Sequence, residues 1–502
     1  MSIIERLSIA NAPTDERSFA SNGVYPTSND RFSELAHTAL GHAVEFRRQT
    51  ELAPPRPVAS VSELRALFDV GLPDQGRSDT AILDMLDRAA REGLVRTIGP
   101  RFFGWVMGAS HPVGVAAEWL TAAWGQNAAI YQTSPAAAVA EEVSASWLLD
   151  LLKLPEESSV GFATGATMAN FTCLAAARSE VLRRQGYDLD EGGLIGAPPV
   201  TVFVGEDAHA SIHSALRYLG FGRSDIVTVL ADSEGRMLAD ELASKLEDCQ
   251  GAKIVVAQAG QINTGAFDPL RQVASVAKRH EAWLHVDGAF GLWARTVPEL
   301  EAYCDGAELA DSWAVDGHKW LQVPYDSGFA IVKDPAAHRR AMDTTASYLG
   351  ETPAGGRNPT HFGPELSRRA RGFAVWAVLQ ALGRSGVADL VRRHCQYAGQ
   401  LADALREEPG ILVHNQVRLN QVLLSFGTGT GDNDAVTDMV IDALRQENAV
   451  FVEGATWKGR RVMRVSIVSH ETSADDIAYL AASIVRNARA QPVSGSDRRA
   501  VP

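Results

Sequence analysis

The stretch Trp283–Ala289 (Trp-Leu-His-Val-Asp-Gly-Ala) and, further along the chain, the stretch Ala314–Leu321 (Ala-Val-Asp-Gly-His-Lys-Trp-Leu) share one pattern. Each begins with a short apolar run, which is typical of a buried β-strand, and then passes into polar and small residues. Asp287 follows the first run and Lys319 follows the second. Because ligands of open α/β sheets bind at the carboxyl ends of the strands, we expect these two side chains to meet in one site.

The two stretches belong to a longer alternation, from about Val115 to Lys333, of helical segments with short β-branched runs. These runs are 201–204, 226–229, 254–256, 283–286 and 329–332. Such alternation predicts right-handed crossovers and an α/β fold with a mostly parallel central sheet that is covered on both faces. A helix at 373–382 and strands around 422–424 and 462–465 then predict a smaller C-terminal α/β domain.

The N-terminal region contains helices but too few apolar residues to form a core of its own. Apolar residues recur at helical spacing from Phe32 and stop before Pro54, and Ser60 with Glu63 forms a capping box that starts a second helix. Both ends of the chain are polar and lack periodicity, so residues 1–30 and the end of the chain are expected to be mobile. We therefore divide the chain into an N-terminal helical arm (1–110), a large domain (111–365), a small C-terminal α/β domain (366–490) and a flexible tail (491–502).

The composition is that of an ordinary globular protein. The chain has 502 residues, of which 46% are hydrophobic and 22% charged, enough to bury a large core. The 47 basic and 61 acidic residues give a net charge of −14 without long basic runs, so nucleic acid is not expected as a partner. No apolar run is long enough to span a membrane, which predicts a cytoplasmic protein without membrane contact. The 4 cysteines are scattered, which predicts reduced thiols and no metal site.

A lysine and a buried carboxylate in one site are what pyridoxal 5'-phosphate requires. The lysine amine binds the cofactor aldehyde covalently, and a carboxylate held against the pyridine nitrogen keeps that nitrogen protonated, so that the ring accepts electrons. Taken singly, a lysine or an aspartate after a strand is more often a solvated surface group. The pairing of Asp287 with Lys319 therefore favours this cofactor only together with the surrounding sequence.

That surrounding sequence resembles a known family. The segments 285–290 (His-Val-Asp-Gly-Ala-Phe), 310–313 (Ala-Asp-Ser-Trp) and 318–321 (His-Lys-Trp-Leu) are similar to those of the group II pyridoxal-dependent decarboxylases, and the similarity runs from about residue 32 to about residue 480. The resemblance implies an aspartate aminotransferase-like fold (fold type I), pyridoxal phosphate as cofactor, and decarboxylation of an L-amino acid to an amine and carbon dioxide. It also implies a homodimer with a composite active site, in which the N-terminal arm packs on the partner.

The resemblance also assigns residues to the cofactor phosphate. The segment Val160–Asn170 passes from a strand through glycine into an alanine-rich helix, and a helix start binds anions through its free N–H groups and its dipole. The family places Ala166 and Thr167 on the phosphate, together with His318. An acidic side chain beside a phosphate is electrostatically unfavourable, so we assign Asp316 no part in the site.

Three further residues receive roles from the resemblance. His209 is expected to stack on the pyridine ring, and Ala289 to leave room at the opposite face of the ring. Tyr348 lies 29 residues after Lys319, where family members carry a loop tyrosine that reaches into the neighbouring subunit and returns a proton to the substrate carbon. The predicted catalytic residues are therefore Lys319, His209 and Tyr348.

Several alternatives stay open at this point. The segment Gln261–Ala266 lacks the paired threonines that are usual in the family, so its contacts are not predicted. Phe102, Phe103 and Trp105 point weakly to an aromatic or bulky substrate, although aromatic residues are more often core than pocket. The reaction could also be another pyridoxal reaction, such as that of an aldehyde synthase, an aminotransferase or a carbon–carbon lyase. A scaffold protein without catalysis is a further alternative.

Overall fold

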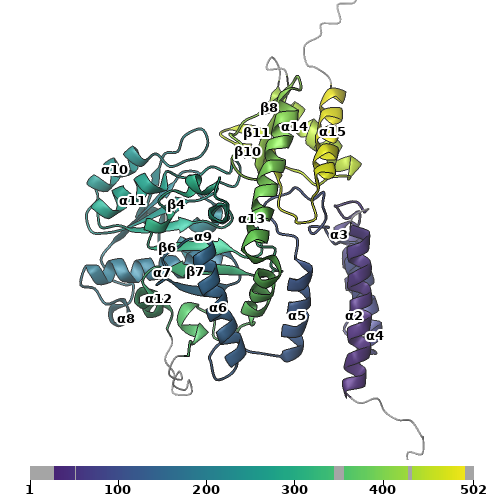
Figure 1. Ribbon diagram of the computed structural model, residues 1–502, viewed down its shortest axis with the longest axis horizontal. Helices are drawn as coiled ribbons and strands as arrows, with labels where there is room; N and C mark the ends of the chain where they lie inside the picture. The colour runs from purple at the N-terminus through teal and green to yellow at the C-terminus, as the bar shows by residue number, and fades with distance from the viewer. Residues whose placement is uncertain (1–27, 51–52, 344–355, 428–431, 492–502) are drawn as a thin grey trace, which may run out of the picture. The chain divides into compact units, whose positions relative to one another are not determined.

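The computed structural model describes residues 28–50, 53–343, 356–427 and 432–491 of the chain (Figure 1). These residues form two compact units. Of the described residues, 28–49 and 58–94 make up the first unit, and residues 50, 53–57 and those from 95 onward make up the second. The helices of the first unit are α2 (Ser28–Thr50, except for its last residue), α3 (Val61–Phe68) and α4 (Asp79–Arg91).

Among the helices of the first unit, α3 begins at its capping box as the sequence predicts, whereas α2 begins at Ser28, before the predicted Phe32 and within the stretch expected to be mobile; all three helices bury very little. Ser60 accepts a hydrogen bond from the N–H of Glu63 (3.3 Å), and the Glu63 carboxylate accepts one from the N–H of Ser60 (2.7 Å), which confirms the capping box. No residue of α3 is buried, and Ala89 is the buried residue of α4. Large apolar side chains such as Phe32 and Leu40 remain exposed. These helices therefore leave large apolar side chains exposed.

The second unit is built on a large sheet of 7 strands in the order β1-β7-β6-β5-β4-β2-β3. The strands are β1 (Ser159–Ala163), β2 (Val200–Gly205), β3 (Ile226–Val229), β4 (Ala252–Gln258), β5 (Trp283–Asp287), β6 (Ser312–Asp316) and β7 (Gly328–Val332). Neighbouring strands are parallel except at β7, which runs antiparallel to both β1 and β6. The mostly parallel α/β fold is therefore confirmed, and the run at 329–332 is its antiparallel strand.

Helices cover both faces of the large sheet (Figure 1). The helices on one face are α7 (Ala166–Arg184), α9 (Ala210–Tyr218) and α12 (Pro335–Met342), and those on the other are α6 (Pro135–Leu151), α10 (Ala239–Glu247), α11 (Leu270–Arg279) and the first part of α13 (Arg371–Arg406). Successive strand residues point to opposite faces, so Val202 packs with α7 while Phe203 packs with α10 and α11. The inner strands are consequently mostly buried along their length, as is typical of parallel sheets.

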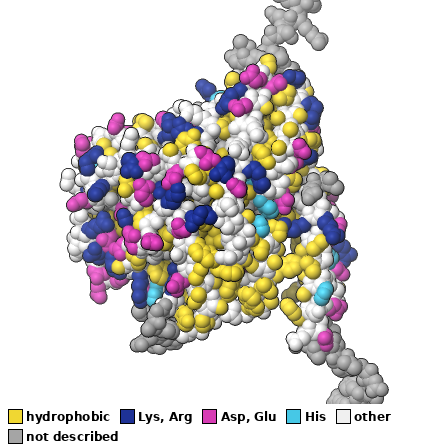
Figure 2. All heavy atoms as spheres, in the orientation of Figure 1, with side chains coloured by type: hydrophobic (Ala, Val, Ile, Leu, Met, Phe, Trp, Pro, Cys, Tyr) yellow, Lys and Arg dark blue, Asp and Glu magenta, His cyan; other side chains and the backbone are white. Residues whose placement is uncertain are grey.

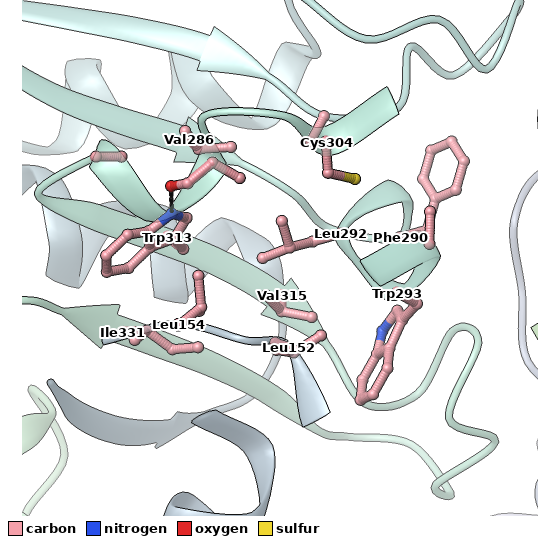
Figure 3. Packing of buried hydrophobic residues seen from close by; sticks show 14 of the residues in the cluster. Leu152, Leu154, Val286, Phe290, Leu292, Trp293, Cys304, Trp313, Val315 and Ile331 are labelled. Carbon is pink, nitrogen blue, oxygen red and sulfur yellow. Dashed lines mark hydrogen bonds between the residues drawn. The ribbon is translucent and has the colours of Figure 1, made fainter. Parts of the chain in front are cut away.

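The core beneath β5 and β6 holds the end of β6 in place (Figure 3). Trp313 and Val315 of β6 lie in a buried cluster with Val286 of β5 and with Leu152. The indole nitrogen of Trp293 donates a hydrogen bond to the carbonyl oxygen of Asp316 (3.0 Å). Burial of each large apolar side chain contributes about 1.5–3 kcal/mol, so the last residue of β6 rests on a rigid support.

A small antiparallel sheet completes the second unit, with the strand order β10-β11-β9-β8. Its strands are β8 (Ile411–Val413), β9 (Gln421–Phe426), β10 (Glu453–Trp457) and β11 (Arg460–Ser466), and it packs against the end of α13, α14 (Asn433–Glu447) and α15 (Ala474–Ala490). Phe103 belongs to this core, and its N–H donates to the carbonyl oxygen of Phe451 (2.8 Å). The predicted domain boundaries at 110, 365 and 490 stay predictions. No described helix has the length and apolar character of a membrane span.

Candidate active site

A cavity of about 290 Å³ lies where several strands of the large sheet reach their carboxyl ends. Its lining residues follow β1, β2 and β4 or stand at the ends of β5 and β6. They are Thr164, Gly165, Ala166, Thr167, His209, Ser211, Gln258, Gly260, Ile262, Asp287, Ala289, Phe290, Asp316, His318 and Lys319. The cavity therefore brings together all the site residues predicted from the sequence except Tyr348, which lies outside the described residues.

Asp316 joins Lys319 to the start of helix α7. Its Oδ2 lies 2.9 Å from the Nζ of Lys319, and its Oδ1 accepts a hydrogen bond from the N–H of Ala166 (2.6 Å). The expectation that Asp316 has no part in the site is therefore wrong. A helix start attracts any anion within reach, and the end of β6 brings this carboxylate to it. A Cβ on Gly165 would lie 2.8 Å from the His318 ring, so glycine is required for this close approach.

His318 is held in a defined orientation beside Asp316. Its Nδ1 accepts a hydrogen bond from the N–H of Ser327 (3.2 Å), and its ring stacks on Tyr325 with 4.4 Å between the ring centroids. Because Nδ1 is an acceptor, the proton of a neutral ring lies on Nε2, which is 3.4 Å from the Oδ1 of Asp316. Burial lowers the pKa of His318, while the Asp316 carboxylate acts in the opposite direction. The ring thus presents an N–H group close to the start of α7.

Asp287 is a buried carboxylate at the end of β5, with 4% of its surface exposed. Its Oδ1 accepts a hydrogen bond from the N–H of Ala289 (3.2 Å), and its Oδ2 accepts one from the Nδ2 of Asn170 (3.4 Å). Burial raises the pKa of Asp287, whereas its electrostatic interactions with His209 and Lys319 act in the opposite direction. The carboxylate and the lysine thus act on each other electrostatically within one cavity.

His209 lies at the start of α9, where its Nδ1 accepts a hydrogen bond from the N–H of Ser211 (3.2 Å). Burial lowers the pKa of His209, and the Asp287 carboxylate opposes this. The ring lines the cavity together with Ala289. Its predicted stacking on the cofactor stays a prediction.

The loop at Gln261 is braced by the glutamine itself. Its Oε1 accepts hydrogen bonds from the N–H groups of Asn263 (2.5 Å) and Thr264 (3.1 Å), and its Nε2 donates to the carbonyl oxygen of Asp207 (3.3 Å). One side chain thus supplies contacts in place of the paired threonines, and the following Ile262 lines the cavity.

The aromatic cluster of 102–105 does not line this cavity. Phe103 is in the core of the small sheet, and Phe102 packs on Phe451 with 4.4 Å between the ring centroids. Trp105 also packs on Phe451, with 5.5 Å between the ring centroids. The structure therefore gives no support to an aromatic substrate pocket formed by these three residues.

Two polar residues that the sequence analysis did not select interact with residues of the site. Asn170 lies one turn into α7 and donates to Asp287. Arg464 comes from β11 of the small sheet, its Nη1 donates to Asn263 (3.4 Å), and its positive charge contributes to lowering the pKa of His209. The buried Nε of Arg464 has no hydrogen-bond partner in the part of the chain that the structure describes. For Asn170 and Arg464, the sequence offered one signal of a functional role, a polar residue among the apolar residues of a helix or strand.

The large sheet is mostly parallel, and a lysine, a buried aspartate and a helix start that suits an anion lie at the carboxyl ends of its strands. This combination defines a pyridoxal phosphate enzyme of fold type I. Residues 62–426 match the family described as the pyridoxal-dependent decarboxylase conserved domain. The chain belongs to this family, and its cofactor is pyridoxal 5'-phosphate.

Individual relatives agree with this assignment. The chain is 26% identical over 363 residues to an aromatic-L-amino-acid decarboxylase of Bacillus atrophaeus, covering 71% of this chain and 73% of that protein. It is 27% identical over 356 residues to the acidic amino acid decarboxylase GADL1 of Xenopus tropicalis, covering 69% and 68%. The solved structure of Oryza sativa TDC with PLP and tryptamine superposes with a TM-score of 0.87 at 22% identity, covering 93% of this chain and 99% of that one. This last similarity concerns the fold.

The residues present fit the cofactor. The start of α7, the His318 ring and Lys319 all line the cavity, and Asp316 contacts both the Ala166 N–H and the Lys319 Nζ, so a phosphate site at the helix start would lie close to the lysine. The buried Asp287 carboxylate suits a protonated pyridine nitrogen. The Asp316 carboxylate at the start of α7 is the one feature that acts against an anion there.

Proposed function

We propose that this protein removes the α-carboxylate of an L-amino acid as carbon dioxide and releases the corresponding amine. The observation that carries the proposal is the presence of Lys319 and the buried Asp287 in one cavity beside the start of α7, in a chain of the decarboxylase family. When bound, the cofactor supplies an electron sink for the electron pair that carbon dioxide leaves behind. The chain's own residues hold the cofactor, orient the substrate and return a proton to the substrate carbon.

Each predicted residue has a place in this proposal. Lys319 would hold the cofactor aldehyde, and the Asp287 carboxylate would keep a proton on the pyridine nitrogen. Ala166, Thr167 and His318 would hold the phosphate through N–H groups, for which the Ala166 N–H would have to exchange its Asp316 acceptor for the phosphate. His209 and Ala289 would flank the ring.

Arg464 is our candidate for the substrate carboxylate. It is a cation held close to His209 by the small sheet, and its buried Nε has no hydrogen-bond partner among the described residues. A guanidinium binds a carboxylate through two parallel hydrogen bonds, which orients the carboxylate as well as attracting it. Arg464→Lys should therefore raise KM more than tenfold while cofactor affinity stays unchanged, because a single ammonium keeps the charge but loses the paired contact.

The carbon atom that loses carbon dioxide must regain a proton, and we propose that Tyr348 supplies it across a dimer interface. This role rests on the resemblance, since Tyr348 lies outside the described residues. Surface character supports a dimer: Trp119, Leu120 and Trp124 of α5 (Pro112–Trp124) are exposed, and Figure 2 shows hydrophobic side chains gathered over α5 and α6. A continuous apolar surface of this kind is typical of an interface, and the proposed occupant is a second copy of the chain.

Mixing two inactive variants tests the dimer and the role of Tyr348 together. In a mixture of Lys319→Ala and Tyr348→Phe chains, about a quarter of the sites should combine an intact lysine with an intact tyrosine, because half of the dimers are mixed and one of their two sites is complete. No recovery of amine formation, despite subunit exchange shown by mass spectrometry, would place Tyr348 in its own chain's site or outside the chemistry.

A product analysis tests the reaction itself. The enzyme with pyridoxal phosphate is incubated with the twenty common amino acids, DOPA, ornithine and diaminobutyrate, and carbon dioxide, amine, aldehyde and ammonia are measured. We expect one amine in equal amount to carbon dioxide. Aldehyde with ammonia as the main product would instead assign an aldehyde synthase, and absence of carbon dioxide from every substrate would contradict the proposal.

A further inference from the structure

Asn170 stands at the junction of a buried chain of hydrogen bonds behind the site. Its Oδ1 lies 2.8 Å from the Nε2 of His285, whose Nδ1 lies 2.9 Å from the Oγ of Ser312. The indole nitrogen of Trp283 donates to the same Oγ (2.9 Å). Asn170, His285 and Ser312 are fully buried. No water competes for these groups, so each donor must match an acceptor.

The direction of every hydrogen bond in this chain follows from the chemistry of its members. The Oδ1 of Asn170 can only accept, so the Nε2 of His285 carries a proton. Burial lowers the pKa of His285 to about 3, so the ring is neutral and its Nδ1 is an acceptor. Ser312 therefore donates its hydroxyl proton to His285 and accepts the indole proton of Trp283. Each hydrogen bond from Trp283 through Ser312 and His285 is therefore donated in the direction of Asn170.

The amide nitrogen of Asn170 in turn donates hydrogen bonds to two residues of the site. One N–H donates to the Oδ2 of Asp287 (3.4 Å) and the other to the Oγ of Ser211 (3.5 Å). The Nδ1 of His209 already accepts the N–H of Ser211, so the Ser211 hydroxyl, 2.8 Å away, donates to it as well. A rotated Asn170 amide would set its oxygen against the Asp287 carboxylate, which is repulsive. The observed orientation is thus the one that suits an ionised Asp287.

We propose that Asn170 is a positioning residue that couples Asp287 to His209, holding the carboxylate ionised and the histidine as its Nε2–H tautomer. The inference rests on the proposed roles of those two residues. Hydrogen bonds that all point one way polarise one another, and the low dielectric of the interior strengthens them. Asn170 also lies one helical turn after Ala166, so helix α7 sets both the predicted phosphate contact and the orientation of Asp287.

A double-mutant cycle on cofactor affinity tests the proposal. Asn170→Leu keeps the approximate shape but removes both donors, and we expect the Kd for pyridoxal phosphate to rise by about 10- to 100-fold, as is usual for a hydrogen bond to a charged group. If Asn170 acts through Asp287, then Asn170→Leu should change the Kd by less than about threefold in an Asp287→Asn background. Equal effects in both backgrounds would show a structural role and overturn the proposal.

A matched control separates coupling from loss of stability. Asn420 is also fully buried, but its Nδ2 donates to the carbonyl oxygen of Ile467 near the small sheet. Asn420→Leu should lower the unfolding temperature by a similar amount, leave the Kd unchanged, and combine additively with Asp287→Asn. An effect of Asn420→Leu on the Kd equal to that of Asn170→Leu would count against the proposal.

A milder variant covers the case in which Asn170→Leu does not fold. Ser211→Ala interrupts only the branch to His209, at a residue that lines the cavity. We expect it to change the pH profile of kcat/KM on the side governed by His209 and to leave the Kd within about threefold of that of the unmodified enzyme, because the Asp287 branch is intact. An unchanged pH profile would show that the branch does not act on His209. Because Kd is measured without turnover, failure of the proposed decarboxylation would not alter the reading of the cycle.

Discussion

Replacing Asp287 by asparagine removes one negative charge from the site while the shape of the side chain is nearly kept. Asp287 is 4% exposed, so little solvent screening weakens its effect on a cation across the cavity. A close opposite charge shifts a pKa by about one to three units, and each unit corresponds to about 1.4 kcal/mol. The ratio of protonated to neutral pyridine nitrogen should therefore fall about 10- to 1000-fold, and kcat should fall with the protonated fraction.

The same substitution carries a cost in stability that must be separated from the loss of catalysis. Asp287 accepts hydrogen bonds from the N–H of Ala289 and from Asn170, and an asparagine side chain offers only one acceptor atom. One buried donor then loses its partner, which costs about 1–3 kcal/mol. Asp311→Asn is the matched control, because Asp311 accepts the N–H of Leu284 (2.8 Å) where β6 begins, at the opposite edge of the sheet from the cavity.

The assay compares kcat, cofactor affinity and urea-induced unfolding for the two variants. We expect Asp287→Asn to lose kcat by at least tenfold with a modest loss of cofactor affinity, and Asp311→Asn to lose stability alone. A kcat for Asp287→Asn that equals that of the unmodified enzyme would refute the reasoning, because the protonation of the ring would then be controlled elsewhere.

Three further predictions follow from the same contacts. Lys319→Ala should abolish turnover but still bind pyridoxal phosphate without a covalent bond, and peptide mapping after borohydride reduction of the unmodified enzyme should label Lys319 and no other lysine. Asp316→Asn should raise the affinity of the cofactor-free enzyme for inorganic phosphate by about 2- to 30-fold in calorimetry, since it removes an anion from the start of α7, where such charges are worth about 0.3–2 kcal/mol; a lower affinity would contradict this. Acid should destabilise the fold below about pH 6.5, because burial lowers the pKa of His285, His338 and His394 from 6.5 to about 3. Below this pH the unfolded chain binds protons that the buried histidines do not bind in the folded protein, so the free energy of unfolding falls by about 1.4 kcal/mol per histidine and pH unit. A free energy of unfolding that stays constant from pH 7 to pH 5 would exclude this effect.

The local features of this protein could be read from its sequence. Strands such as β5 are short apolar runs, and the capping box at Ser60 is a contact between residues three apart, so neighbouring residues carry the information. Asp287 and Lys319 follow such runs, which predicted both the edge of the sheet and the cofactor. Ala166, Thr167, His209 and His318 were predicted through the resemblance, and the fold brings them to the same cavity.

Tertiary structure alone decided which distant residues meet. Asp316 contacts Ala166 from 150 positions away, Asn170 contacts His285 from 115, and Arg464 enters from a different sheet. The antiparallel direction of β7 was equally invisible, because an apolar run is the same in either direction. A pattern of polar and apolar residues states which side chains are buried, but it does not name their partners. Partners are set by how the sheets and helices pack, and for that reason the charge at the start of α7 and the chain of donors behind Asp287 appear only in the folded molecule.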